Sequence, residues 1–221
     1  KVVFMSNTST IIGWDVGGAN LKAVVIDAQG IVIDAFQEPC PLWRGLHELE
    51  KAVDQILSNI DVVANQHAIT MTGELVDLFA NRHEGVVSIA DLMQRKLDGS
   101  LYFYASQQGF VDSCSVSEKS RYIASANWHA SATYAAQVFG QGLMIDIGST
   151  TSDFVALYEG LPKILGFSDA DRMRENTLVY NGVARTPLMA LASRIDFDGA
   201  LTNVAAEHFA TTADVYRLTG D

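Results

Sequence analysis

The chain has 221 residues, 48% of them hydrophobic and 19% charged, which is typical of a folded globular protein and not of a disordered one. Its formal net charge is −11, with 26 acidic residues against 15 scattered basic ones. Nucleic acid is therefore a poor partner, because phosphate backbones require clustered Lys and Arg. A small-molecule or protein partner is favoured.

Membrane and metal-cluster functions are also disfavoured. No apolar run approaches the roughly 18–20 residues of a bilayer span, and residues 1–10 lack the charged and apolar blocks of a signal peptide. Cys40 and Cys114 are the only cysteines and the five histidines are dispersed, so we expect reduced thiols and no zinc cluster. The sequence predicts a cytoplasmic protein that contacts no membrane. Its oligomeric state stays open, with a homodimer as one alternative.

The first predicted element is a hairpin with an acid beside its turn. The apolar run 11–16 carries Asp15 near its end, and a glycine turn leads into a strand over Leu21–Asp27. A second turn at residues 28–30 leads into a third strand, Ile31–Phe36. The sequence therefore predicts an antiparallel meander of three strands.

Helices and strands then alternate. From Leu46 to Ile60 apolar residues recur at steps of three and four, which predicts a helix with one buried face. The later expected elements are a strand over His67–Met71, a weak helix over Val86–Leu97, a strand over Leu101–Ala105 and one Ala-rich helix over Arg121–Phe139.

A second meander begins after the turn at residues 140–142. Its expected strands are Leu143–Ile147, Thr151–Tyr158 and Ile164–Ser168, followed by helices near Leu188–Ser193 and Ala210–Leu218. This restart predicts two lobes, 1–140 and 141–221. We expect the second lobe to be incomplete in this chain, because it lacks the later strands of the first.

Both hairpins have the residue types that suit a metal ion and a polyphosphate. Asp15 and Asp146 are the expected Mg²⁺ ligands, since Mg²⁺ on a diphosphate keeps several waters and one or two carboxylates. Small residues let the backbone amides approach phosphate, although a tight turn alone would also select them. The expected phosphate-binding residues are Gly17, Gly18, Asn20, Lys22, Gly148, Ser149, Thr150 and Thr151.

The repeated hairpins resemble those of the actin, hexokinase and Hsp70 superfamily. Gly13-x-Asp15-x-Gly17-Gly18 with Lys22 looks like its first phosphate hairpin, and the segment from Asp146 to Thr151 looks like its second. The resemblance implies an α/β fold that is duplicated, actin-like and ribonuclease H-like, with two lobes around a phosphate-binding cleft. The continuation to Asp153 is more similar to the hydantoinase A and oxoprolinase branch.

A narrower resemblance covers nearly the whole chain. Five segments look like those of the tetrahydromethanopterin-linked C1 transfer pathway proteins, namely Pro39–Gly45, Thr70–Leu75, Ser125–Trp128, Gly182–Pro187 and Ala213–Leu218. This resemblance implies a transferase of methanofuran or methylofuran biosynthesis. Such an enzyme joins an aminomethylfuran methyl diphosphate to the phenol oxygen of a tyramine derivative and releases diphosphate.

The implied reaction needs charge stabilisation and a base. Lys22, Mg²⁺ and the turn amides would stabilise the leaving diphosphate, and Asp153 or Glu74 would take the phenol proton. Each of these acids is equally suited to be a surface carboxylate or a helix cap. Arg185 is expected to bind a substrate carboxylate unless it forms a structural ion pair, and Trp128 and Tyr180 are expected to stack on substrate rings unless they belong to the core.

Two other functions stay open. An ATP-dependent hydrolase or small-molecule kinase would use the same hairpins for γ-phosphoryl transfer. A nucleotide-binding scaffold without chemistry is the third alternative. We expect the final region of the superfamily, which normally carries the adenosine-binding glycines, to lie outside this chain, and Gly73 stands where many relatives carry Ala. ATP as a ligand is therefore left undecided.

Overall fold

The protein is described by a computed structural model that covers residues 10–220. Residues 1–9 and 221 lie outside the described residues. The expectation that residues 1–10 form no signal peptide therefore falls almost entirely outside them. The chain divides into two compact units between Ala130 and Ser131, within helix α4 (Asn127–Phe139). None of the helices between residues 10 and 220 combines the length and apolar character that a bilayer span requires.

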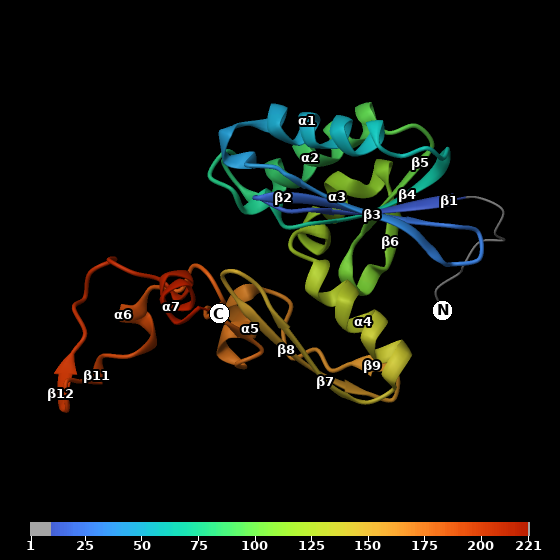
Figure 1. The fold of residues 1–221 in the computed structure, drawn as a ribbon. Coiled ribbons are helices and arrows are strands. Elements are labelled where there is room, and N and C mark those ends of the chain that lie inside the picture. The colour runs from blue at the N-terminus through green and yellow to red at the C-terminus, as the bar shows by residue number, and fades with distance from the viewer. Residues whose placement is uncertain (1–9, 221) are drawn as a thin grey trace. The chain divides into compact units, whose positions relative to one another are not determined.

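The first unit contains a mixed six-stranded sheet in the order β3-β2-β1-β4-β5-β6 (Figure 1). Its strands are β1 (Thr10–Val16), β2 (Asn20–Ile26), β3 (Val32–Pro39), β4 (Ala64–Met71), β5 (Ser100–Tyr104) and β6 (Phe110–Asp112). The first three strands pair antiparallel, as the meander predicted, and β4 and β5 add in parallel beside β1. The expected α/β class is confirmed.

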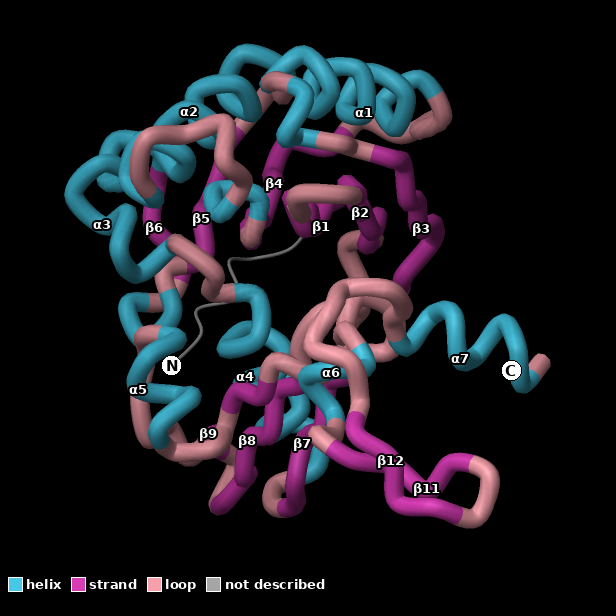
Figure 2. The backbone as a smooth tube through the Cα atoms, turned by 90° about the vertical axis from the view of Figure 1, so that its left-hand side faces the viewer, coloured by secondary structure: helices cyan, strands magenta, loops and turns pink. Residues whose placement is uncertain are grey.

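Two helices cover one face of this sheet. Figures 1 and 2 show α1 (Leu46–Ser58) and α2 (Arg82–Lys96) side by side on that face. Alternate residues of β1, Ile12, Trp14 and Val16, point into this core and are at most 3% exposed. The buried His67 accepts a hydrogen bond from Trp14 Nε1, and its Nε2 lies 3.0 Å from the Asp98 carbonyl oxygen. Because Nδ1 accepts this hydrogen bond it carries no proton, so the ring is a neutral member of the core, and burial lowers its pKa.

The Ala-rich helix expected over Arg121–Phe139 is wrong as a single element. The structure has α3 (Val116–Ile123) and α4, separated by residues 124–126. Ser125 lies in the left-handed region with φ +51°. Its hydroxyl donates to the carboxyl of Glu74, 51 residues earlier in the chain. A helix prediction based on local composition does not include hydrogen bonds between distant residues. Here such tertiary contacts override the helical propensity of alanine.

The second unit is built on a smaller antiparallel sheet in the order β10-β8-β7. Its elements are β7 (Gly142–Ile147), β8 (Ser152–Tyr158), β9 (Leu161–Pro162), α5 (Asp169–Arg174), β10 (Leu178–Val179), α6 (Leu188–Leu191), β11 (Arg194–Phe197), β12 (Ala200–Asn203) and α7 (Thr212–Thr219). The strand expected over Ile164–Ser168 is wrong. The strand that follows the turn after β8 is the two-residue β9, which ends before residue 164. Ser168 instead caps α5, where its hydroxyl accepts a hydrogen bond from the amide of Asp171.

The two hairpins are equivalent in register. Asp15 lies directly opposite Lys22 across β1 and β2, and Asp146 lies directly opposite Asp153 across β7 and β8. The β7 residues equivalent to the buried Ile12, Trp14 and Val16 are therefore 143, 145 and 147, and these three are 52–59% exposed. The hairpin repeats, but the packing on this face of the strand does not.

Candidate functional site

The first turn, residues 17–19, is held from behind by the backbone of the segment that follows β3. The amides of Leu42 and Cys40 donate to the carbonyl oxygens of Gly18 (3.0 Å) and Ala19 (2.8 Å). In a planar trans peptide the N–H points away from the carbonyl, so the amide of Ala19 faces the opposite side. That amide donates none of the hydrogen bonds found among residues 10–220, so it is free for an anion.

Asp15 is held from both neighbouring strands. Lys22 Nζ on β2 lies 3.2 Å from Asp15 Oδ2, and the hydroxyl of Thr70 on β4 donates to Oδ1 at 3.4 Å. The Asp15 side chain keeps 29% exposure and that of Lys22 53%. The structure thus places an acid and a cation next to each other beside the first turn, where both are accessible to solvent.

The second turn, residues 148–151, is clamped by three successive amides. Val183 donates to the carbonyl of Gly148 (3.0 Å), and Ala184 and Arg185 donate to that of Ser149 (3.1 and 2.8 Å). By the same peptide geometry the amides of Ser149 and Thr150 point away from the clamp. Neither amide donates a hydrogen bond within the described part of the chain. Each turn therefore offers unpaired N–H groups beside an aspartate.

Gly182 is the point of closest contact with the second turn. A Cβ at this position would lie 2.6 Å from Gly148 O, Ser149 C and Thr150 N, all of them backbone atoms. We expect Gly182→Ala to displace the turn, and so to lower the free energy of unfolding by about 1–3 kcal/mol and to weaken diphosphate binding. Urea unfolding measures the loss of stability, and calorimetry measures the loss of binding. Gly13→Ala is the control, because its Cβ would meet nothing closer than 4.0 Å, and equal stability of the two variants would contradict this expectation.

The two acids of the second hairpin differ in their surroundings. Asp146 is exposed, and no hydrogen bond or ion pair found among residues 10–220 involves its side chain. Asp153 is 15% exposed and forms an ion pair with the buried Arg172 of α5. Burial raises the pKa of Asp153; Arg172 opposes that rise and Asp146 adds to it. Asp153 is thus a paired acid, and Asp146 is a free carboxylate.

These carboxylates suit Mg²⁺ bound through a phosphate. Within the described residues no three His, Cys, Asp or Glu side chains form a group able to hold a metal ion by themselves. Mg²⁺ ordinarily uses one or two carboxylates, with waters and substrate phosphates completing its octahedron. The unpaired carboxylate of Asp146 fits that pattern, and so does the solvent-accessible carboxylate of Asp15.

Glu74, the other candidate base, is buried. It lies in a short 3₁₀ helix (Gly73–Leu75) after β4 and is 2% exposed. The Ser125 hydroxyl donates to its Oε1 at 2.7 Å, while Oε2 has no hydrogen-bond partner among the described residues. Burial raises the pKa of Glu74; the hydrogen bond from Ser125 and the charge of Arg82 act in the opposite direction.

The raised pKa of Glu74 predicts a pH-dependent stability. A carboxyl whose pKa is higher in the folded state favours folding at low pH, and this contribution is lost as pH rises through the folded pKa. Glu74→Gln removes the titration, so we expect the variant to gain stability relative to the native chain as pH increases from 5 to 8. Melting temperatures across this range test it, with the exposed Glu118→Gln as control. A pH-independent difference would contradict the expectation.

The expected substrate residues lie in three different settings. Trp128 is 6% exposed and packs edge-on against His129, which favours its core role. Tyr180 is 54% exposed. Arg185 is exposed and joins no ion pair found among residues 10–220, while its backbone clamps the second turn. Of these, only Arg185 is tied directly to a turn.

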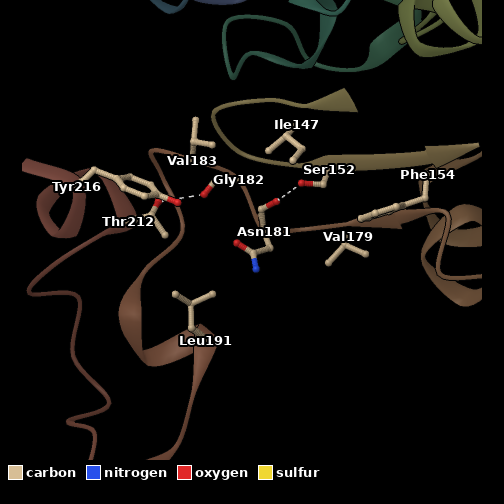
Figure 3. A pocket seen from close by; sticks show the side chains of 10 residues that line it. All are labelled: Ile147, Ser152, Phe154, Val179, Asn181, Gly182, Val183, Leu191, Thr212 and Tyr216. Atoms are coloured by element: carbon tan, nitrogen blue, oxygen red, sulfur yellow. Dashed lines mark hydrogen bonds between the residues drawn. The ribbon is translucent and has the colours of Figure 1, made fainter. Parts of the chain in front are cut away.

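A hollow of about 410 Å³ lies beside the second turn (Figure 3). Figure 3 shows Ile147 and Ser152 of the hairpin on its wall, with Asn181 and Leu191 also projecting into it. Because side chains alternate along a strand, Asp146 and Asp153 point to the other face of the sheet. The hollow therefore does not contain the acids of the hairpin.

The sequence predicts no role for several residues that support the site. Thr70, Ser125 and Thr186 lie in segments that carry the resemblance and Arg172 and Thr212 do not, yet each takes part in a side-chain hydrogen bond of the site or its support. The Thr186 and Thr212 hydroxyls hold Gly182 against the second turn. The spacing of Thr186 four residues after Gly182 is a local cue, whereas the other partners come from distant elements.

Comparison with known proteins gives a family match and two curated relatives. The hydantoinase/oxoprolinase family model matches residues 65–221. A synthase of Methanocaldococcus jannaschii is 33% identical over 93% of this chain, which spans 60% of that relative's length. It is named for its product, a furanylmethanamine that carries a γ-glutamylaminoethyl-phenoxymethyl group. A Methanococcus vannielii synthase of the same name is 38% identical over 33% of this chain and 32% of its own length.

Among solved structures, the chain is similar to ethanolamine utilization protein EutJ of Carboxydothermus hydrogenoformans. The TM-score is 0.43 with 14% identity, over 71% of this chain and 50% of that one.

Proposed function

The chain belongs to the hydantoinase/oxoprolinase family, and we propose that it is a transferase that joins a furanylmethyl group to a phenol oxygen with release of diphosphate. The observation that carries this proposal is the 33% identity to the methanogen synthase over 93% of the chain. The reaction belongs to the synthesis of a methanofuran-type carrier in tetrahydromethanopterin-linked C1 metabolism. The whole relative's activity is a proposal for this chain, which spans 60% of its length.

The geometry of the turns supports a diphosphate ligand. Each turn exposes unpaired amides, of Ala19 in the first unit and of Ser149 and Thr150 in the second. Such amides bind phosphate oxygens through fixed partial charges. Lys22 adds a cation beside the first turn, and Arg185 adds one beside the second. The exposed Arg185 is also the group proposed to bind an anionic part of the acceptor.

In the proposed reaction, the bond between the furanylmethyl carbon and the diphosphate oxygen breaks while the phenol oxygen bonds to that carbon. The departing diphosphate gains negative charge, which Lys22 and the turn amides stabilise. Mg²⁺ held by a carboxylate beside a turn, Asp15 at the first or Asp146 at the second, would neutralise part of the same charge. The phenol proton passes to a carboxylate, and Asp153 is the better candidate because it keeps 15% exposure against 2% for Glu74.

The direct test incubates the full chain with Mg²⁺, a furanylmethyl diphosphate and γ-glutamyltyramine. Mass spectrometry detects the ether, and a coupled assay detects released diphosphate. Equal amounts of ether and diphosphate are expected. Absence of both would overturn the proposal, and ATP turnover in a parallel reaction would favour the ATP-dependent hydrolase or kinase instead.

A further inference from the structure

Glu74 is placed between the first turn and the break that separates α3 from α4. Its own short helix touches the turn directly. The amide of Thr72 donates to the carbonyl of Val16 at 2.9 Å, and a Cβ on Gly73 would lie 3.2 Å from that same oxygen and 3.4 Å from Gly17 O. A displacement of Gly73 therefore displaces the turn.

The position of Glu74 is fixed from two sides. A Cβ on Gly85 of α2 would lie 2.9 Å from the Cα, Cβ and carbonyl oxygen of Glu74, so this helix packs on its backbone. The Ser125 hydroxyl holds the carboxyl at 2.7 Å from a residue with φ +51°. Non-glycine residues adopt this conformation rarely, and persist in it where surrounding contacts compensate.

We propose that Glu74 is a positioning residue, which holds Gly73 behind the first phosphate turn through its bond to Ser125, and is not the base of the reaction. A carboxyl that is 2% exposed does not meet a phenol in this arrangement. Its role is to keep the turn in the conformation that presents the Ala19 amide. The hydrogen bond needs only an acceptor oxygen at Oε1, which an amide supplies as well as a carboxylate does.

Only the expected effects on turnover rest on the proposed function. The positioning role itself is tested by diphosphate binding, which needs no knowledge of the reaction. The variants are Glu74→Gln, Glu74→Ala and Ser125→Ala, with Ser120→Ala as matched control. Ser120 lies in α3, five residues before the half-buried Ser125; it is 8% exposed and its hydroxyl is hydrogen-bonded to His83. Calorimetry with inorganic diphosphate and Mg²⁺ gives affinities, and urea unfolding gives the stability of each variant.

We expect Glu74→Gln to keep the native diphosphate affinity within about twofold, and Glu74→Ala and Ser125→Ala to weaken it about tenfold. Ser120→Ala loses stability without losing affinity. Where turnover is measurable, Glu74→Gln keeps kcat and the pH profile, while the alanine variants raise KM for the diphosphate ester more than they lower kcat.

Three results would overturn the inference. Loss of turnover in Glu74→Gln, with loss of the acidic limb of the pH profile in the residual activity, would make Glu74 the base. Alanine variants that lose stability but bind diphosphate normally would show that Glu74 stabilises the fold without positioning the turn. Absence of diphosphate binding by the native chain would mean that the first turn does not bind phosphate, and would also contradict the proposed function.

Discussion

Asp146→Asn will lower the rate of diphosphate release at least about 100-fold while leaving the fold intact. The carboxylate of Asp146 joins no hydrogen bond or ion pair found among residues 10–220, so asparagine of nearly equal volume removes no contact. What it removes is the negative charge proposed to hold Mg²⁺ beside the second turn. A factor of 100 corresponds to about 2.7 kcal/mol, within the several kcal/mol that a bound metal supplies to developing charge.

A binding measurement separates this prediction from the identity of the substrates. Calorimetry with inorganic diphosphate should show a Mg²⁺-dependent heat for the native chain that is greatly reduced in Asp146→Asn. The control is Asp196→Asn on β11, an exposed aspartate in the same unit but outside the hairpin. Equal Mg²⁺ dependence in both variants would remove Asp146 from the site, and a lowered melting temperature of Asp146→Asn would give the carboxylate a structural role instead.

Periodicity and turn chemistry were sufficient to predict the first unit as far as β4. The antiparallel meander, the amphipathic helix from Leu46 and the strand ending at Met71 all follow from local patterns, and the structure confirms them. A further local signal lies in the second unit. Asp198-Gly199 lies between two short apolar stretches and forms the turn of the β11–β12 hairpin, with φ of +52° and +73°. Both positive values are typical of a type I′ turn, for which Asp-Gly is a preferred pair.

The tertiary partners of the acids could not be predicted. Nothing in the sequence near Asp153 indicates that Arg172, 19 residues later, will be buried against it. Similarly, the alanines around Ser125 favour an unbroken helix, whereas at the break Ser125 bonds to the distant Glu74. Charge pairs and buried hydrogen bonds depend on which elements pack together, and the sequence period of one element does not contain that information. For this reason the turns were predictable and their supports were not.

The sequence treated Asp153 and Glu74 as equivalent candidates for the base, and the structure separates them. Both are carboxyls whose pKa is raised first by burial. Asp153 is paired with a guanidinium, whereas Glu74 accepts a hydrogen bond from the Ser125 hydroxyl and keeps one oxygen without a partner in the described part of the chain. The Asp153–Arg172 pair therefore has the larger consequence for stability, because a charge that loses its partner in a buried setting is expensive.

Arg172→Met should lower the free energy of unfolding by about 3 kcal/mol at pH 7, near the lower end of the range for breaking a buried ion pair, because Asp153 keeps 15% exposure. The variant leaves the Asp153 carboxylate without its cation, beside Asp146 and Asp169, whose charges already raise its pKa. Its pKa must then rise further above that of the unfolded chain. The stability of the variant should recover as pH falls and decline as pH rises through the folded pKa.

A double-mutant comparison isolates the cause of that loss. If the penalty comes from an unpaired buried charge, Arg172→Met combined with Asp153→Asn should recover most of the stability at pH 7 and should lose the pH dependence. Arg174→Met in the same helix is the control, since its side chain is 71% exposed and the change should stay within about 0.5 kcal/mol. A double variant as unstable as Arg172→Met alone would mean that Arg172 stabilises the unit by packing and through its bond to the Thr177 carbonyl. The ion pair with Asp153 would then contribute little to the free energy of unfolding, and only the exposure of Asp153 would bear on its suitability as a base.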